Sequence, residues 1–288
     1  MVKATKLGGT AKNVVVAKVA HGLMTMTILS PAPVPDKQAF ESIKSGIDAL
    51  PPGVKMMLNS AEFYGYDWTI GNLELLARFF EKYPEYADRT FLSVKANVLR
   101  QSLEKSIAAL RGTKKIDLFQ PARIDPEVSV EEIMRTLVEM VHEGKFDHIG
   151  LSECRADTFR RGHVIYPVSV VKIEISSMVY EEETKNRVQK LPVVIVTAVE
   201  LDIAIAAYSP LAHGMTSGAV KTPQDLPVER RRHARSLQVD DAGARRAFAD
   251  LALSKGCTPA QLSIAWVGSL PGRESHPSTR FFEEGAHA

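Results

Sequence analysis

The chain has 288 residues, of which 45% are hydrophobic and 24% are charged, a composition that suits one large domain or two ordinary ones. Its 36 Lys and Arg residues nearly balance its 34 Asp and Glu residues, and the net charge of +2 excludes the strongly basic footprint of a nucleic-acid-binding protein. Two cysteines without metal-ligand spacing predict no metal site and a reducing compartment. No apolar run reaches the roughly 18 residues of a membrane helix and no secretory leader is evident, so we expect a cytoplasmic protein.

Short apolar runs alternate with helical patterns along most of the chain. Strands are expected at residues 14–20, 56–58, 90–94, 116–119, 148–151, 168–175 and 203–207. Helices are expected at residues 36–50, 70–80, 101–110, 129–141, from Asp157 onward, and at 241–255 and 260–267. Because the strands are apolar without alternation, both faces of their sheet should be covered, as in a parallel α/β sheet.

A parallel sheet of this kind either closes into a barrel or stays open as a doubly wound fold. The absence of a GxGxxG motif after the first strand argues against a dinucleotide fold of the open type. Polar residues also end strand after strand, which fits one shared mouth: Asn59, Lys95, Gln120, Ser152, Lys172 and Tyr208. We therefore predict a single (β/α)8 TIM barrel domain over residues 1–288. No eighth strand is evident before Pro277, so the barrel is either incomplete there or closed by a degenerate segment.

A polar segment from about residue 215 to 239 interrupts the pattern. It contains the basic run at residues 229–233. Long loops in compact domains are often functional, but a solvated basic loop is the better interpretation of the arginines.

The stretch at residues 59–65, Asn-Ser-Ala-Glu-Phe-Tyr-Gly, follows the apolar run 56–58 and leads into further aromatic residues. Taken alone, Tyr64 fits a half-buried loop tyrosine as well as a functional one. The stretch nevertheless resembles the signature after the second barrel strand of aldo-keto reductases, in which an aspartate stands five positions before the catalytic tyrosine. Here the spacing is kept and Asn59 takes the place of the aspartate.

The resemblance to aldo-keto reductases extends over most of the chain. It is carried by residues 93–95, 117–120, 144–145, 150–152, Glu174, 207–211 and 213–214, in the order and rough spacing of that family. The resemblance implies a (β/α)8 barrel that reduces aldehydes and ketones with NADPH. It also implies a small-molecule aldehyde as the partner, and neither nucleic acid nor membrane.

Two of the four catalytic positions of the family match this chain. The resemblance assigns proton donation to Tyr64 and makes Lys95 the cation that lowers its pKa, since a phenol of pKa about 10 is a poor acid at neutral pH. Asn59 can hold Lys95 by a hydrogen bond but cannot neutralise it, and Ala122 stands at the histidine position. Residues 59–65, 119–125 and 150–154 resemble the fungal pyridoxal reductase branch, which shares both departures. Pyridoxal reduction is therefore expected; the alternative is a catalytically weak, cofactor-binding regulatory protein on the same fold.

The cofactor positions follow from the same resemblance. Ser152 and Lys172 should contact the nicotinamide amide, although Lys172 replaces a glutamine and can donate but not accept. Tyr208 should stack on the nicotinamide ring, and Ser209 and Leu211 should begin the pyrophosphate loop. Gly22, with Met24 beyond it, ends the first strand where a backbone can approach a ligand closely, although a simple turn fits equally well. Ser278, Thr279 and Arg280 lie where the family binds the 2′-phosphate, for which a guanidinium is geometrically suited.

Overall fold

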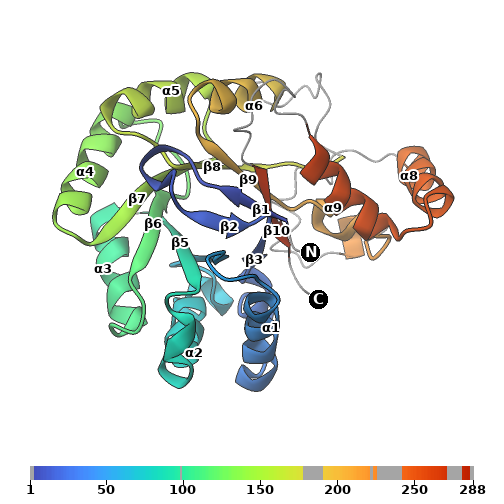
Figure 1. Ribbon diagram of the computed structural model, residues 1–288, viewed down its shortest axis with the longest axis horizontal. Helices are drawn as coiled ribbons and strands as arrows, with labels where there is room; N and C mark the ends of the chain where they lie inside the picture. Colours follow the sequence, from blue (N-terminus) through green and yellow to red (C-terminus); the bar gives the residue numbers. More distant parts are fainter. Residues whose placement is uncertain are drawn as a thin grey trace.

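The computed structural model describes residues 3–97, 99–177, 191–220, 223–225, 242–270 and 281–285. Eight parallel strands form a closed barrel in the order β10-β3-β4-β5-β6-β7-β8-β9, and helices surround it (Figure 1). The strands are β3 Val19–Gly22, β4 Met56–Ala61, β5 Thr90–Ala96, β6 Ile116–Pro121, β7 Phe146–Ser152, β8 Val170–Glu174, β9 Ala204–Tyr208 and β10 Phe281–Gly285. The helices are α1 Asp36–Asp48, α2 Gly71–Lys82, α3 Leu99–Leu110, α4 Val130–His142, α5 Ala156–Ile165, α6 Leu191–Glu200, α8 Ala242–Ser254 and α9 Pro259–Ser269.

The predicted (β/α)8 TIM barrel is confirmed, with three corrections. The apolar run 14–20 is two strands, β2 Val15–Ala17 and β3, separated at Lys18. Helix α6 was not predicted, because its sequence is apolar almost throughout and shows no helical period. The barrel is not left open: β10, which follows Pro277, pairs with β9 on one side and with β3 on the other.

An amino-terminal hairpin covers one end of the barrel (Figure 1). Its strands, β1 Ala4–Lys6 and β2, pair antiparallel. The Gly8 amide donates to the Ser169 carbonyl at 3.1 Å, and Lys55 N donates to Val15 O at 3.0 Å. A Cβ on Gly8 would lie 2.2 Å from the Asp202 carbonyl oxygen, so glycine allows this close approach. Ser169, Asp202 and Lys55 precede β8, β9 and β4, so the hairpin closes the amino ends of the strands.

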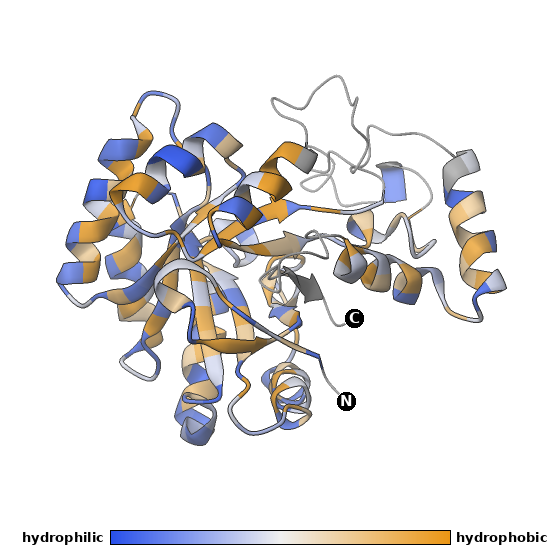
Figure 2. Ribbon diagram, turned by 45° about the horizontal axis from the view of Figure 1, so that its top comes forward, coloured by the Kyte–Doolittle hydropathy of each residue, from blue (hydrophilic) through white to orange (hydrophobic). Residues whose placement is uncertain are grey.

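Two buried layers stabilise the barrel. The inner layer combines hairpin residues such as Leu7 and Val16 with strand residues such as Met57 and Phe91. The larger outer layer lies between the strands and the helices and contains fully buried rings such as Phe79. Figure 2 shows the same division, with hydrophobic residues along the strands and hydrophilic residues on the outer sides of the helices. Burial of apolar surface, at about 25 cal/mol per Å², is therefore the main stabilising contribution.

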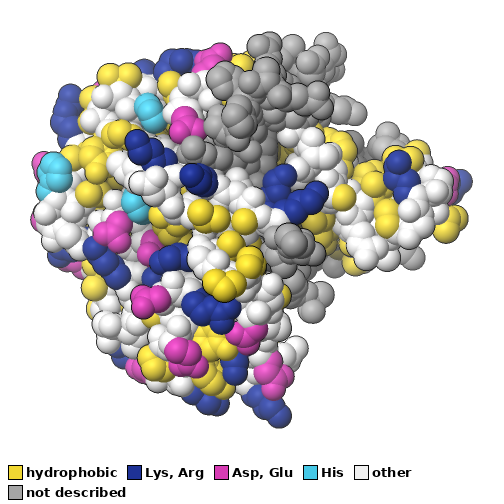
Figure 3. Space-filling view, viewed as in Figure 1, with side chains coloured by type: hydrophobic (Ala, Val, Ile, Leu, Met, Phe, Trp, Pro, Cys, Tyr) yellow, Lys and Arg dark blue, Asp and Glu magenta, His cyan; other side chains and the backbone are white. Residues whose placement is uncertain are grey.

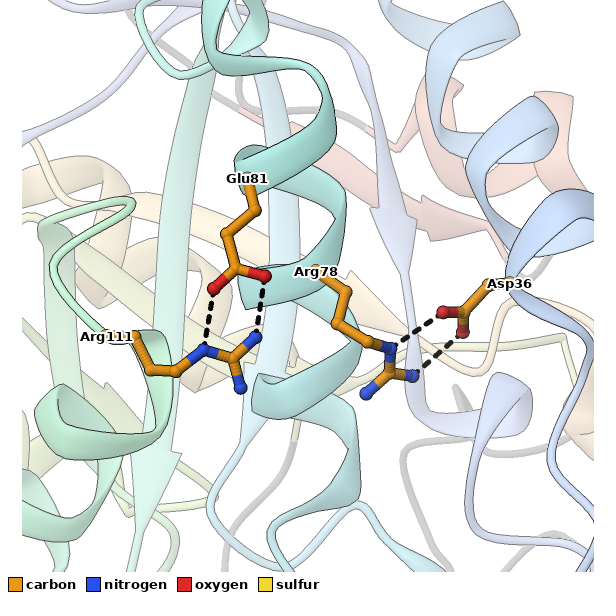
Figure 4. Close-up of polar contacts among 4 residues, drawn as sticks. All are labelled: Asp36, Arg78, Glu81 and Arg111. Carbon is orange, nitrogen blue, oxygen red and sulfur yellow. Dashed lines mark hydrogen bonds and ion pairs between the residues drawn. The ribbon is translucent and has the colours of Figure 1, made fainter.

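Ion pairs join neighbouring helices at the surface. Arg78 on α2 donates to Asp36 on α1 at 2.7 and 2.8 Å, and Arg111 donates to Glu81 on α2 at 2.7 and 2.9 Å (Figure 4). The hydrogen bond from Arg78 lowers the pKa of Asp36. Because these side chains are 40% or more exposed, water screens the charges and each pair adds little to the stability of the fold. On the face in Figure 3, basic and acidic side chains are intermingled rather than segregated.

None of the described helices is long and apolar enough to cross a membrane.

Candidate active site

The polar residues predicted at strand ends all lie toward the same end of the barrel. Asn59, Lys95, Gln120, Ser152, Lys172 and Tyr208 occupy the last three positions of β4, β5, β6, β7, β8 and β9. Because neighbouring barrel strands are parallel, these carboxyl ends form one mouth, opposite the hairpin. This is the end at which α/β barrels carry their binding sites.

The loop after β4 carries Tyr64 into the mouth. Tyr64 is buried, and its amide donates to the Ala61 carbonyl at 3.3 Å. The next residue, Gly65, donates from its amide to the Thr69 carbonyl at 2.7 Å. A Cβ on Gly65 would lie 2.6 Å from that carbonyl oxygen and 2.8 Å from the Gly71 nitrogen. Only glycine fits this turn without displacement of backbone atoms, so the shape of the tyrosine loop depends on residue 65.

The ammonium group of Lys95 lies among aromatic rings from two strand ends. Its Nζ is 4.9 Å from the centroid of the Tyr64 ring, 5.9 Å from that of Phe63 and 5.8 Å from that of Tyr208. A cation at such distances interacts favourably with the faces of aromatic rings. The structure therefore brings together Tyr64, Lys95 and Tyr208, which the sequence predicted to share a site.

A polar layer lies beneath these rings, inside the barrel. Asn59, Ser93, Gln120 and Lys172 line a small internal cavity. Gln120 Nε2 donates to Ser93 Oγ at 3.1 Å. The side-chain nitrogen of Asn59 is buried and has no hydrogen-bond partner among the residues that the structure describes. Asn59 thus belongs to the floor of the site, and its pairing with Lys95 stays a prediction.

Tyr208 is held in its neutral form. Burial raises its pKa well above 10, and the carboxylates of Glu153 and Glu174 raise it further, while Arg123 opposes them. Glu153 itself is oriented by a hydrogen bond from the Glu174 amide to its Oε1 at 2.9 Å. Lys172 Nζ lies 5.7 Å from the Tyr208 ring centroid. A neutral, half-buried ring at the mouth suits stacking rather than proton transfer.

Ser152 ends β7 with a fully buried side chain. Its hydroxyl has no hydrogen-bond partner within the described ranges. A buried hydroxyl without a partner costs free energy, so it marks a position where a ligand amide could bind. The adjacent Glu153 has a positive φ of 52°, a strained conformation of the kind that collects at functional sites.

The remaining predicted cofactor positions surround the mouth. Gly22 pairs with Asn59 at the end of β3, and Met24 begins the short 3-10 helix Met24–Met26. Ser209, with a φ of 53°, follows β9, and Leu211 precedes the turn Ala212–Gly214. Helix α9 supports this loop, because Ser263 Oγ donates to the Pro210 carbonyl at 2.6 Å.

Some predicted positions lie outside the described residues. They are Ser278, Thr279 and Arg280, and the arginine run at 229–233 within the predicted long loop. Phe281, the next described residue, begins β10 by pairing with Ile205 near the amino end of β9. Tyr208 lies at the other end of β9.

Sequence reasoning missed several residues that shape the site. Arg123 and Glu153, which act on Tyr208, lay in the recognised stretches 119–125 and 150–154 but were assigned no role. Thr27 and Asn72, which reach the tyrosine loop, lay in no recognised motif. An asparagine near the start of an otherwise apolar helix pattern, as at Asn72, is the one sequence signal that pointed to a buried polar residue.

A comparison with protein-family models decides the family. The model described as the Aldo/keto reductase family matches residues 18–276. The chain belongs to the aldo-keto reductase family. Aldo-keto reductases are oxidoreductases that use nicotinamide cofactors, and the mouth described above is where this barrel would hold one.

Similar curated proteins come from fungi. "Probable pyridoxal reductase 2" of Schizosaccharomyces pombe is 37% identical over 224 residues, which is 73% of this chain and 64% of that protein. "Aldo-keto reductase yakc [NADP(+)]" of the same yeast is 34% identical over 65% of this chain and 55% of its own length. "Aldo-keto reductase str7" of Strobilurus tenacellus is 30% identical over 73% of this chain and 63% of that protein. The chain thus spans less than two thirds of the length of each of these relatives.

Solved structures show the same fold. A glycerol dehydrogenase from Gluconobacter oxydans superimposes with a TM-score of 0.73 over 99% of this chain and 86% of that one, at 16% identity. A thermostable aldo-keto reductase in complex with the inhibitor epalrestat gives a TM-score of 0.69 over 99% of this chain and 90% of that one, at 18% identity. At these identities the likeness supports the barrel fold alone.

Proposed function

We propose that this aldo-keto reductase uses NADPH to reduce an aldehyde to an alcohol, with pyridoxal as its substrate and pyridoxine as the product. One observation carries the proposal: the Lys95 ammonium lies 4.9 Å from the Tyr64 ring centroid, beside the half-buried Tyr208 ring, at the strand ends. The similarity to a probable pyridoxal reductase supports the substrate, and a relative named for NADP(+) supports the cofactor.

The residues at the mouth fit a nicotinamide ring. Bound NADPH would supply a hydride to the aldehyde carbon. Tyr208 offers a neutral, half-buried aromatic face for stacking, and Ser152 offers a buried hydroxyl that has no hydrogen-bond partner among the described residues. Lys172, at 5.7 Å from the centroid of the Tyr208 ring, adds an N–H donor for the amide oxygen.

Tyr64 would donate its phenolic proton to the aldehyde oxygen. The positive charge of Lys95, close to the Tyr64 ring, would stabilise the phenolate that remains after the transfer, because a nearby opposite charge favours the ionised form. Tyr64 is buried, so this attraction is screened less than it would be at the surface. Lys95 on β5 and Tyr64 in the loop after β4 would thus act together, the lysine supporting the tyrosine as the acid.

Ala122 at the end of β6 replaces the histidine that the resemblance led us to expect. It is a buried residue whose amide donates to the Ala96 carbonyl at 2.7 Å. A methyl group occupies less volume than an imidazole, so alanine at this position would leave room for a ring-bearing aldehyde. This is the feature of the chain that favours pyridoxal over a small linear aldehyde.

Replacing Tyr64 with phenylalanine tests the assignment of the acid. Tyr64→Phe should retain NADPH binding and lower kcat about 10²–10⁴-fold, the usual contribution of general acid catalysis. Tyr66→Phe is the matched control, because Tyr66 lies two residues away and is 48% exposed. The measurements are NADPH oxidation at 340 nm and NADPH titration by fluorescence. A Tyr64→Phe enzyme as active as Tyr66→Phe would overturn the assignment.

A panel of aldehydes tests the substrate. Pyridoxal, benzaldehyde and a linear aldehyde are compared by kcat/KM, and pyridoxal should rank first. If another aldehyde ranks first, the reaction stands but the substrate is wrong. If NADPH binds and no aldehyde is turned over, the protein is the cofactor-binding regulatory type, which the replacement of two catalytic positions at Asn59 and Ala122 keeps as the second candidate.

A further inference from the structure

Asn72, the second residue of α2, is fully buried and makes three hydrogen bonds through its side chain. Its Oδ1 accepts from Ser60 Oγ on β4 at 2.6 Å. Its Nδ2 donates to the Leu23 carbonyl and to Thr27 Oγ1, each at 2.8 Å. Both amide hydrogens are therefore used, and a helix, a strand and the loop after β3 meet at one side chain.

The chain of hydrogen bonds continues to the tyrosine loop. Thr27 Oγ1 donates to the backbone carbonyl of Tyr64. A hydroxyl has a single hydrogen, so Thr27 Oγ1 donates to the Tyr64 carbonyl and accepts from Asn72 Nδ2. The order of donors is thus fixed from Ser60 through Asn72 and Thr27 to Tyr64.

This order admits only asparagine at residue 72. The Leu23 carbonyl can only accept, so the group facing it must be the amide nitrogen and not the oxygen. Aspartate has the same shape but no donor, and would set a negative charge against two oxygen atoms. Leucine would remove the acceptor of the buried Ser60 hydroxyl and the donor that Thr27 Oγ1 accepts from, which costs free energy.

The two loops joined by Asn72 have different tasks in the proposed reaction. Residues 23–27 contain Met24, predicted to contact the cofactor, and the Leu23 amide is bonded in turn to the Asn59 carbonyl at 3.1 Å. Residues 61–65 carry the proton donor. The Asn72 side chain binds the backbone of the loop after β3 directly, at Leu23, and binds the tyrosine loop through Thr27. It therefore sets the distance between these two loops.

We propose that Asn72 is a positioning residue that fixes Tyr64 relative to the loop after β3, and so relative to the bound nicotinamide. The inference rests on the proposed function only for the identity of the reaction. The hydrogen-bond relay itself does not depend on the identity of the reaction.

The test uses isosteric variants with a matched control. Asn72→Asp removes both donors, Thr27→Val removes the hydroxyl, and Thr27→Ser retains it. Ser106→Ala is the control, because the Ser106 hydroxyl is also buried and donates to the Ser102 carbonyl at 2.7 Å, but on α3. The measurements are kcat and KM, the NADPH dissociation constant, the isotope effect with NADPH deuterated at the transferred position, and hydrogen exchange of the ligand-free protein.

In Asn72→Asp and Thr27→Val we expect kcat to fall about 10- to 100-fold, since a displacement of about 1 Å can cost about 10²-fold. The NADPH dissociation constant should change less than kcat, and the isotope effect should rise as hydride transfer becomes slower. Thr27→Ser should restore most of the rate. Exchange should accelerate in peptides covering residues 23–27 and 61–65, and Ser106→Ala should show none of these changes.

Two results would overturn the proposal: a kcat in Asn72→Asp and Thr27→Val equal to that of Ser106→Ala, or equal rates in Thr27→Ser and Thr27→Val. If the wild type reduces no aldehyde, the proposed function fails, and hydrogen exchange alone decides the relay. Unchanged exchange at residues 61–65 in Thr27→Val would then refute it.

Discussion

Replacing Gly65 with alanine would test how closely the tyrosine loop is held to its observed shape. The added Cβ would lie 2.1 Å from Thr69 Oγ1, 2.6 Å from the Thr69 carbonyl oxygen and 2.8 Å from the Gly71 nitrogen. The first contact can be relieved by rotation of the threonine side chain. The other two are with backbone atoms, so the chain itself must move.

The size of that movement follows from the contacts. Ordinary van der Waals contact begins at 3.4 Å, so the carbonyl contact at 2.6 Å requires a shift of about 0.8 Å. Overpacking of this kind typically costs about 1–3 kcal/mol in the free energy of unfolding. A displacement close to 1 Å at the proton donor can lower kcat by up to about 10²-fold. We therefore expect Gly65→Ala to lose both stability and activity.

Gly71→Ala is the matched control, because a Cβ there meets no atom closer than 3.7 Å. Urea unfolding gives the stability of both variants, and NADPH-dependent aldehyde reduction gives their activity. Adding Thr69→Ala to Gly65→Ala removes the side-chain contact but neither backbone contact, so the double variant should stay impaired. Equal behaviour of Gly65→Ala and Gly71→Ala would show that the loop adjusts freely and that the reasoning is wrong.

Three further predictions concern the cofactor, a thiol and a histidine. Arg280→Ala should weaken NADPH but not NADH binding about tenfold, as expected for a lost hydrogen bond to a charged group of roughly 1.5–3 kcal/mol; equal losses in fluorescence titration would place the 2′-phosphate elsewhere. Burial raises the pKa of Cys154 to about 12, so iodoacetamide at pH 8 should label this residue in urea but hardly in the native protein, as read by mass spectrometry. Burial lowers the pKa of His148 in the folded protein. Below the ordinary histidine pKa of about 6.5, the unfolded chain therefore binds a proton more readily than the folded one. The free energy of unfolding should decrease as the pH is lowered below this value and stay constant above it. His148→Phe should reduce that fall when urea unfolding is compared at pH 7.5 and 5.5, and an unchanged fall would contradict the assignment.

The sequence predicted elements wherever a local pattern was sufficient. A helix was predicted from residue 129, and the structure places Ser129 at its start as the cap of α4, with Ser129 Oγ accepting from the Glu132 amide at 3.2 Å. The closing strand β10 was missed because two of its five residues are glutamates, unlike the apolar runs of the other strands. Its place in the sheet is decided by its neighbours β3 and β9, which no local pattern records.

The residues at the strand ends of the site were predictable from the sequence, but their contacts with one another were not. Strand-end residues such as Lys95 and Tyr208 follow from the rule that parallel strands share a mouth. The contact of Lys95 with three rings depends on how the loop after β4 folds back over the neighbouring strand ends. The roles of Thr27 and Asn72 depend on hydrogen bonds across 37 to 49 positions of sequence, which only a folded chain displays.

The hairpin across the amino ends of the strands has a consequence for hydration. With β1 and β2 seated there, water reaches the polar floor at Asn59, Gln120 and Lys172 through the mouth rather than from below. A molecule that covers the mouth therefore also governs the dielectric environment of the floor. The attraction between the Lys95 ammonium and the rings around it should strengthen when the mouth is filled, because charges interact more strongly where water is excluded.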